Sequence, residues 1–308
     1  MIATALLAPS VARVRTSFRR LVAGSDEPDL SALLEPAGDP GLFGADSATW
    51  VVHSDLAMLV GGLRALLVQM LHPLAMAGVA DHSDYRGDPW GRLHRTGEFL
   101  GLTTFGPAAA AEAALETVRR VHLRVRGTAP DGRAYSAGDP HLVEWIHIAE
   151  VDSFLRAHQR YGQAPLDAAG ADAYVSEMAV IAERLGSANP PRTVSSLRAR
   201  LEAFRPELQV GSQARAAVRF LAVPPLPAAA RPAYGLVTAA AVGLLPGFAR
   251  RALWLPVLPV VDPVAVRPAM RAVLLAGSWA LGASPARAAA EARVAAAPGP
   301  PAVGTTDG

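Results

Sequence analysis

The sequence contains no cysteine, and this absence removes several kinds of site. Disulfides, thiolate-bound zinc, iron–sulfur clusters, thiolate-ligated haem and covalently attached c-type haem all require cysteine. Any bound metal must therefore use histidine or carboxylate ligands. Lysine is absent too, so the 29 basic residues are all arginine, and against 27 acidic residues they leave a net charge of +2. Such a small basic excess gives no reason to expect a nucleic-acid partner.

Aromatic residues are scarce, at 6% of the 308 residues, whereas 51% of the chain is hydrophobic. Alanine, leucine and valine must therefore fill most of the interior. A membrane-spanning helix needs about 20 apolar residues with few charges. The longest apolar region, residues 56–80, is interrupted by Arg64, Gln69, His72 and Pro73. We expect a buried core helix here and no transmembrane segment.

The two ends of the chain differ in composition from its middle. Residues 1–24 form an arginine-rich arm that leaves peripheral membrane contact open. A signal peptide would carry its charge first, whereas this arm starts with an apolar run, so we expect a cytoplasmic protein. We divide the chain into an N-terminal arm and loop (residues 1–44), a helical domain (45–292) and a tail that is disordered by composition (293–308).

The middle of the chain shows helical periodicity and no set of alternating strands. We predict an all-α fold, a single domain of roughly a dozen helices. A central helix over residues 56–71 should end at His72, because a following proline disfavours the α conformation. A second helix, residues 108–126, should end with Gly127 as its C-cap.

Residues 91–127 are predicted to form two helices joined by a turn, and they carry the main candidate site. The apolar stripe of the second helix advances in steps of 4, 3, 4 and 3 and comprises Ala111, Leu115, Val118, His122 and Val125. A lone imidazole on an apolar side can ligate the iron of a b-type haem. It can equally be an ordinary core histidine, and periodicity alone leaves both interpretations open.

The first helix of this pair carries cationic and hydroxyl side chains. Arg92 and Thr96 lie one turn apart on the same face, where they could together orient O₂ bound to a haem. Arg95 lies beside Thr96 and could meet a haem propionate.

Other chemistries have less support. The segment Glu144 to His147 is a Glu-x-x-His motif of the kind found in di-iron helix bundles, but such sites need a second copy, which the sequence lacks. There is no G-x-S-x-G elbow, phosphate-binding loop or HExxH zinc motif.

Four motifs, HPLAMAGVADHS, RLHRT, RRVHLRVRG and YSAGDPHLVEWIHIAE, occur in this order along the chain. Together they resemble the latex-clearing-protein (rubber oxygenase) and MpaB-type oxygenase family, over roughly residues 45–260. The resemblance implies an all-α fold that encloses a buried haem b. It implies His122 as the proximal iron ligand, with Arg92 and Thr96 on the distal side.

One position departs from the rubber-cleaving members. In those proteins a lysine precedes the threonine and can approach the iron, whereas this chain has Arg95. A guanidinium stays protonated, so we expect no lysine-like distal ligand. Those members also use a distal glutamate as a base, and the polar candidates near that place are Asp81, His82 and Asp84.

The resulting hypothesis is a haem-dependent oxygenase that acts with O₂ on an apolar, isoprenoid- or lipid-like substrate. The alternatives are a haem-binding protein without catalysis and a metal-free helical protein that binds apolar ligands. The sequence leaves the substrate, the redox partner and the oligomeric state open.

Overall fold

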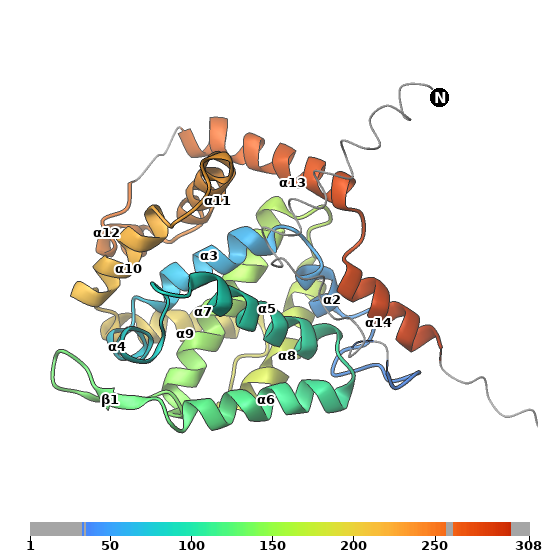
Figure 1. Cartoon of the computed structure of the whole chain (residues 1–308), viewed down its shortest axis with the longest axis horizontal. Helices are drawn as coiled ribbons and strands as arrows, with labels where there is room; N and C mark the ends of the chain where they lie inside the picture. The colour runs from blue at the N-terminus through green and yellow to red at the C-terminus, as the bar shows by residue number, and fades with distance from the viewer. Residues whose placement is uncertain (1–32, 34, 257–260, 297–308) are drawn as a thin grey trace, which may run out of the picture.

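The computed structural model describes residues 33, 35–256 and 261–296, and these residues are mostly helical (Figure 1). The α-helices are α2 (Ala48–His53), α3 (Met58–Gln69), α4 (Pro73–His82), α5 (Pro89–Phe105), α6 (Ala108–His122), α7 (Pro140–Tyr161), α8 (Ala168–Leu185), α9 (Val194–Phe204), α10 (Ser212–Ala222), α11 (Arg231–Gly243), α12 (Gly247–Ala252), α13 (Arg267–Leu281) and α14 (Pro285–Ala295). The predicted all-α class is confirmed. The arginine-rich arm and the end of the predicted tail lie outside the described residues.

Two helices, α3 and α7, form the centre of the core. They approach closely at Gly61, where an added Cβ would lie 2.8 Å from Cδ1 of Phe154. The same crossing holds a buried ion pair, with Nη2 of Arg64 2.7 Å from Oδ2 of Asp152. Arg64 also donates to the Ser153 hydroxyl and to the Leu244 carbonyl. Each of the three guanidinium nitrogens of Arg64 therefore donates to a partner, and this makes the positive charge tolerable in an otherwise apolar core.

The chain bends sharply between α3 and α4, by 106°. His72, the N-cap of α4, is extended, and Pro73 starts the new helix. This is the break that the His72-Pro73 pair predicted. The bend is held from outside by Gln209, whose backbone N–H donates to the Leu71 carbonyl at 2.9 Å.

Helix α6 ends earlier than the sequence predicted, at His122 rather than near residue 126. Gly127 is not its C-cap, because it belongs to strand β1 (Arg126–Thr128), which pairs antiparallel with β2 (Ala134–Ser136) across an Asp-Gly turn. Gly127 lies opposite Tyr135, and an added Cβ would be 2.6 Å from the tyrosine oxygen. The glycine is thus required by a close side-chain approach rather than by a helix end.

The apolar region predicted to be a core helix became two helices, and α3 is largely buried. Among the described residues, one helical stretch, Asp262–Leu281, is by length and composition apolar enough to cross a membrane, and the bent pair α3 and α4 would pass the same test as one span. Only 17% of the most apolar window in Asp262–Leu281 is buried, and Leu275 and Trp279 are exposed there. The sequence alone did not single out Asp262–Leu281 as a possible membrane-spanning helix.

Candidate functional site

The first half of α5 carries three of the predicted site residues. Asp88 caps the helix by accepting from the Gly91 N–H at 2.8 Å, and Pro89 starts it. Arg92 is half-buried and donates from Nη1 to the Ser83 hydroxyl at 2.7 Å. Burial, together with the neighbouring Arg95, lowers the pKa of Arg92. The α4–α5 connection therefore holds this guanidinium in place.

Thr96 and Arg95 are more exposed than Arg92. The Thr96 hydroxyl donates to the Arg92 carbonyl at 3.0 Å, so both lie on one face, as their spacing predicted. Arg95 is 68% exposed and pairs with Asp88 at 3.3 Å. Among the three, Arg92 is the one whose position is fixed by packing, whereas Arg95 can move freely toward an anionic group.

The fourth predicted residue, His122, is the last residue of α6 and is half-buried. Its Nδ1 atom is buried and has no hydrogen-bond partner among the described residues. Burial lowers the pKa of His122, so the ring is neutral at neutral pH and keeps a lone pair. A neutral imidazole with a lone pair is the form that ligates a metal.

The two predicted groups lie toward the same end of the α5–α6 hairpin, the end away from its turn. Helices α5 and α6 run in opposite directions from the Gly106-Pro107 turn and diverge in the view of Figure 1. Arg92 and His122 are both near the end away from this turn. Within the described residues no hydrogen bond or ion pair joins His122 to Arg92, Arg95 or Thr96. The geometry groups these residues by region, and their predicted roles stay predictions.

A polar cluster at the end of α4 adjoins this region through the Arg92–Ser83 hydrogen bond. The Tyr135 hydroxyl donates to Oδ2 of Asp81 at 2.7 Å, and Nε2 of His82 is 3.1 Å from the same hydroxyl. Burial and the Asp81 carboxylate raise the pKa of Tyr135 to about 12. A depression of about 300 Å³ borders the cluster. The sequence analysis named Asp81 and His82 but missed Tyr135, which comes from the β-hairpin.

A second polar network is buried where α2, α5, α7 and α8 meet. Nδ1 of His53 is 2.7 Å from the Thr104 hydroxyl, and its Nε2 is 3.2 Å from the Tyr174 hydroxyl. Burial lowers the pKa of His53 to about 3 and that of His147 to about 4. It raises the pKa of Glu150 to about 7. His53 and His147 are therefore neutral at neutral pH, and Glu150 stays protonated to a higher pH than an exposed carboxyl group does.

The Glu-x-x-His motif does not form half of a di-iron site. Both carboxylate oxygens of Glu144 are bound by Arg200, with Nε at 2.6 Å and Nη2 at 2.5 Å. Nε2 of His147 is buried without a partner among the described residues. An arginine already occupies the carboxylate, which leaves it unable to act as a bridging metal ligand.

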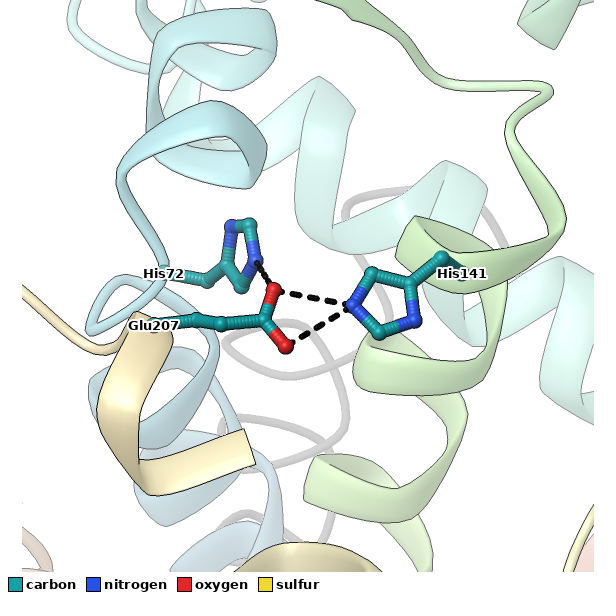
Figure 2. Close-up of side chains that lie close together, drawn as sticks. All are labelled: His72, His141 and Glu207. Carbon is teal, nitrogen blue, oxygen red and sulfur yellow. Dashed lines mark hydrogen bonds and ion pairs between the residues drawn. The ribbon is translucent and has the colours of Figure 1, made fainter. Parts of the chain in front are cut away.

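Three further residues meet in a cluster that the sequence analysis did not assemble (Figure 2). His72, His141 and Glu207 come from the α3–α4 bend, the first turn of α7 and the 3₁₀ helix η2 (Arg205–Glu207). Nε2 of His141 is 2.8 Å from Oε2 of Glu207, and Nε2 of His72 is 3.4 Å from the same oxygen. No local motif links residues so far apart, so only the fold brings them together.

The architecture and these sites define an all-helical protein with its predicted chemistry on a helical hairpin. Residues 50–275 match the family described as ER-bound oxygenase mpaB/B'/Rubber oxygenase, catalytic domain. Because this match covers more than half of the chain, the chain belongs to that family, and the resemblance seen in its motifs is confirmed. The family supports oxygenase activity in general terms.

Two mycobacterial relatives are also similar to part of the chain. They are uncharacterized protein Mb2261 of Mycobacterium bovis and uncharacterized protein Rv2237 of Mycobacterium tuberculosis, each 33% identical over 100 residues. The alignment covers 32% of this chain and 37% of each relative. The chain thus spans little more than a third of the length of the curated relatives it matches. No solved structure shows a significant match.

Proposed function

We propose that this protein is a haem b-dependent oxygenase that uses O₂ to oxidise an apolar, isoprenoid- or lipid-like substrate. The observation that carries the proposal is the buried Nδ1 of His122, which has no partner among the described residues, in a chain that belongs to an oxygenase family. A buried polar nitrogen without a partner is costly unless a ligand satisfies it. Haem iron bound at that nitrogen would remove the cost.

The surroundings of the hairpin fit a flat cofactor in two further respects. Gly97 and Gly101 lie one turn apart on α5, and an added Cβ at either would meet no atom within 4 Å. Space without side chains is what the close approach of a planar ring requires. Arg92 and Arg95 supply cationic groups for the haem propionates or for the distal side, and no cysteine competes as an axial ligand.

When bound, haem would supply the O₂ binding and activation that no side chain of the chain can provide. The roles of the protein's residues follow from their contacts. His122 would offer its neutral imidazole as the proximal ligand. Arg92, fixed by Ser83, would direct N–H donors and positive charge toward the distal side. The Thr96 hydroxyl would give up its hydrogen bond to the Arg92 carbonyl and donate one to O₂ instead.

The substrate class is supported by the apolar side chains around the open end of the hairpin. Leu93 on α5 is 48% exposed, and Val121 and Leu123 at the end of α6 are 51% and 71% exposed. Exposed apolar side chains beside a candidate site are suited to contact with an apolar molecule. We therefore place the substrate entry between the end of α6 and the start of α5.

Absorption spectra of the protein reconstituted with haem, both oxidised and reduced, test the proposal. We expect a Soret band that is lost in His122→Ala and kept in His147→Ala, together with O₂ consumption when an apolar alkene is added. A colourless protein after reconstitution would favour the metal-free binder of apolar ligands. Haem uptake without O₂ consumption on any alkene would favour a haem-binding protein without catalysis. Loss of haem in His147→Ala but not in His122→Ala would indicate that His147, on α7, is the iron ligand.

A further inference from the structure

The cluster of His72, His141 and Glu207 lies on other residues than the proposed haem site, and its geometry is that of a metal centre. The ligand atoms of the three side chains all lie within 4.8 Å of one another. Figure 2 shows both imidazole rings directing a nitrogen at the carboxylate of Glu207. Two histidines and one carboxylate are a common three-residue ligand set for divalent transition metals, zinc among them.

The first ligand, His72, is rigid and short of partners. Its side chain is 1% exposed, and the α3–α4 bend fixes its backbone. Its Nδ1 atom is buried without a partner among the described residues. With the proton on Nε2 the ring donates to the Glu207 carboxylate, whereas with the proton on Nδ1 the Nε2 lone pair faces the carboxylate and a cation between the two atoms removes their repulsion.

The second ligand, His141, is held by an aromatic stack. Its ring lies 4.4 Å from that of Phe204 at an interplanar angle of 25°. Phe204 ends α9, directly before η2, so the same segment that supplies Glu207 also orients His141. The side chain of His141 is 48% exposed, which leaves it free to adjust by a few tenths of an ångström.

Two of the three separations between ligand atoms fit a tetrahedral ion after a small adjustment, and the third, between the two histidine nitrogens, is within 4.8 Å. Zinc ligands lie about 2.0–2.2 Å from the metal, and tetrahedral geometry then separates neighbouring ligand atoms by about 3.3 Å. The His72–Glu207 separation of 3.4 Å meets this value. The His141–Glu207 separation of 2.8 Å is about half an ångström short, and it involves the exposed, adjustable ring.

The surrounding charge permits a cation. Arg133 is close enough to act on both His72 and Glu207, and it would oppose a metal. Its guanidinium is however paired with Asp131 at 2.7 Å, which offsets most of its positive charge. Glu207 is 38% exposed, so solvent can reach the cluster and supply a fourth ligand.

We propose that His72, His141 and Glu207 form a binding site for a divalent transition-metal ion of the zinc class, with water as the fourth ligand. The ion would join the α3–α4 bend to the start of α7 and to η2, three segments far apart in the sequence. It would stabilise the folded state, since the three ligands are together only there. The site is independent of haem, so each proposal can fail without the other.

The test uses untagged, full-length protein dialysed against a chelator and then titrated with Zn²⁺ or Co²⁺. We expect one equivalent of Zn²⁺ by metal analysis, visible absorption from bound Co²⁺, and a higher melting temperature with Zn²⁺. Glu207→Gln and His141→Ala should each weaken Zn²⁺ binding at least tenfold and abolish the melting shift. Glu202→Gln, an exposed glutamate of the same segment paired with Arg205, is the matched control and should bind like the wild type.

Zinc and cobalt are measured separately from iron, so haem content does not affect the result. Circular dichroism of each variant shows whether it is folded, and both substituted side chains are partly exposed. Wild-type protein that takes up no Zn²⁺ or Co²⁺ at one equivalent would overturn the proposal. Stoichiometric binding that survives in both Glu207→Gln and His141→Ala would overturn it too, because the ion would then be bound elsewhere.

Discussion

Tyr135 reaches Asp81 across a space that Gly127 leaves free. The tyrosine hydroxyl donates to the carboxylate at 2.7 Å, and a Cβ on residue 127 would lie 2.6 Å from that hydroxyl oxygen. Gly127 follows α6 closely, so the hairpin that ends this helix also positions the tyrosine. The polar cluster beside Arg92 therefore depends on a glycine that takes no part in its hydrogen bonds.

The first prediction follows from this contact. Gly127→Ala should displace the Tyr135 ring and break its bond to Asp81, because the buried ring also packs against Gly78. We expect a loss of about 1–3 kcal/mol in the free energy of unfolding, typical of overpacking with a lost buried hydrogen bond. Urea unfolding measures it. Gly138→Ala is the control, since its added Cβ would meet only atoms 3.8 Å or more away. Equal losses in both variants would contradict the role of the contact.

The second prediction concerns the ion pair between α3 and α7. Arg64→Met should destabilise the protein by about 3 kcal/mol, because it leaves the buried Asp152 carboxylate with one arginine instead of two. Arg156→Met removes the other arginine, whose side chain is 46% exposed, and should cost less than about 1 kcal/mol. Denaturant titrations of the two variants compare them directly. A larger loss in Arg156→Met would show that the exposed pair holds the carboxylate.

The third prediction is a pH dependence of stability from Glu150. Burial raises its pKa from 4.5 to about 7 in the folded state. Between these values the folded protein binds more protons at this site than the unfolded chain, so the site's contribution to stability falls as pH rises and is constant above pH 7. Glu150→Gln has no titrating carboxyl group at this position, so it lacks this pH-dependent contribution to stability. Its stability relative to the wild type should rise by roughly 3 kcal/mol from pH 4.5 to pH 8.

His53 and His147 act in the opposite direction, because burial lowers their pKa values and favours folding as pH rises. Both are present in wild type and variant, so they cancel in the comparison. A stability difference between Glu150→Gln and wild type that stays constant from pH 4.5 to pH 8 would mean that folding leaves the pKa of Glu150 unchanged.

Local sequence signals predicted the helices and several of their ends, and they failed where distant segments decide the structure. Pro73 marked the bend after α3, and the apolar stripe of α6 placed His122 on its half-buried side. The early end of α6 could not be predicted from the local sequence, because Arg126 pairs with Ser136 in the β-hairpin and therefore does not continue the helix. Hydrophobic periodicity shows which face of a single helix is apolar. It does not show which helices pack their apolar faces against each other.

The same limit explains the clusters that the sequence analysis missed. His141 and Glu207 are 66 residues apart, and Arg64 and Asp152 are 88 apart. The Arg64–Asp152 pair forms where α3 crosses α7 beside Gly61, and the His141–Glu207 pair forms where η2 meets the first turn of α7. Each motif that identified the family is a short continuous stretch of sequence, and for that reason the motifs could be recognised without the fold.

The fourth prediction compares two arginines that lie three residues apart on α5. Arg92 is half-buried and fixed by Ser83, whereas Arg95 is exposed and paired only with Asp88. If Arg92 acts on the distal side of haem, Arg92→Met should lower the rate of alkene-dependent O₂ consumption at least tenfold, about 1.4 kcal/mol of transition-state stabilisation, with haem content kept.

Arg95→Met serves as the matched variant, since it removes the same charge from the same helix. We expect it to weaken haem binding a few-fold and to leave the rate per bound haem nearly unchanged, because an exposed ion pair with a propionate contributes little. Ser83→Ala should give part of the Arg92→Met loss, since the guanidinium would keep its charge but lose its anchor. A greater loss of rate in Arg95→Met than in Arg92→Met would show that Arg95, rather than Arg92, acts on the distal side of haem. The exposed Arg95 side chain would then have to move toward the cofactor when haem binds.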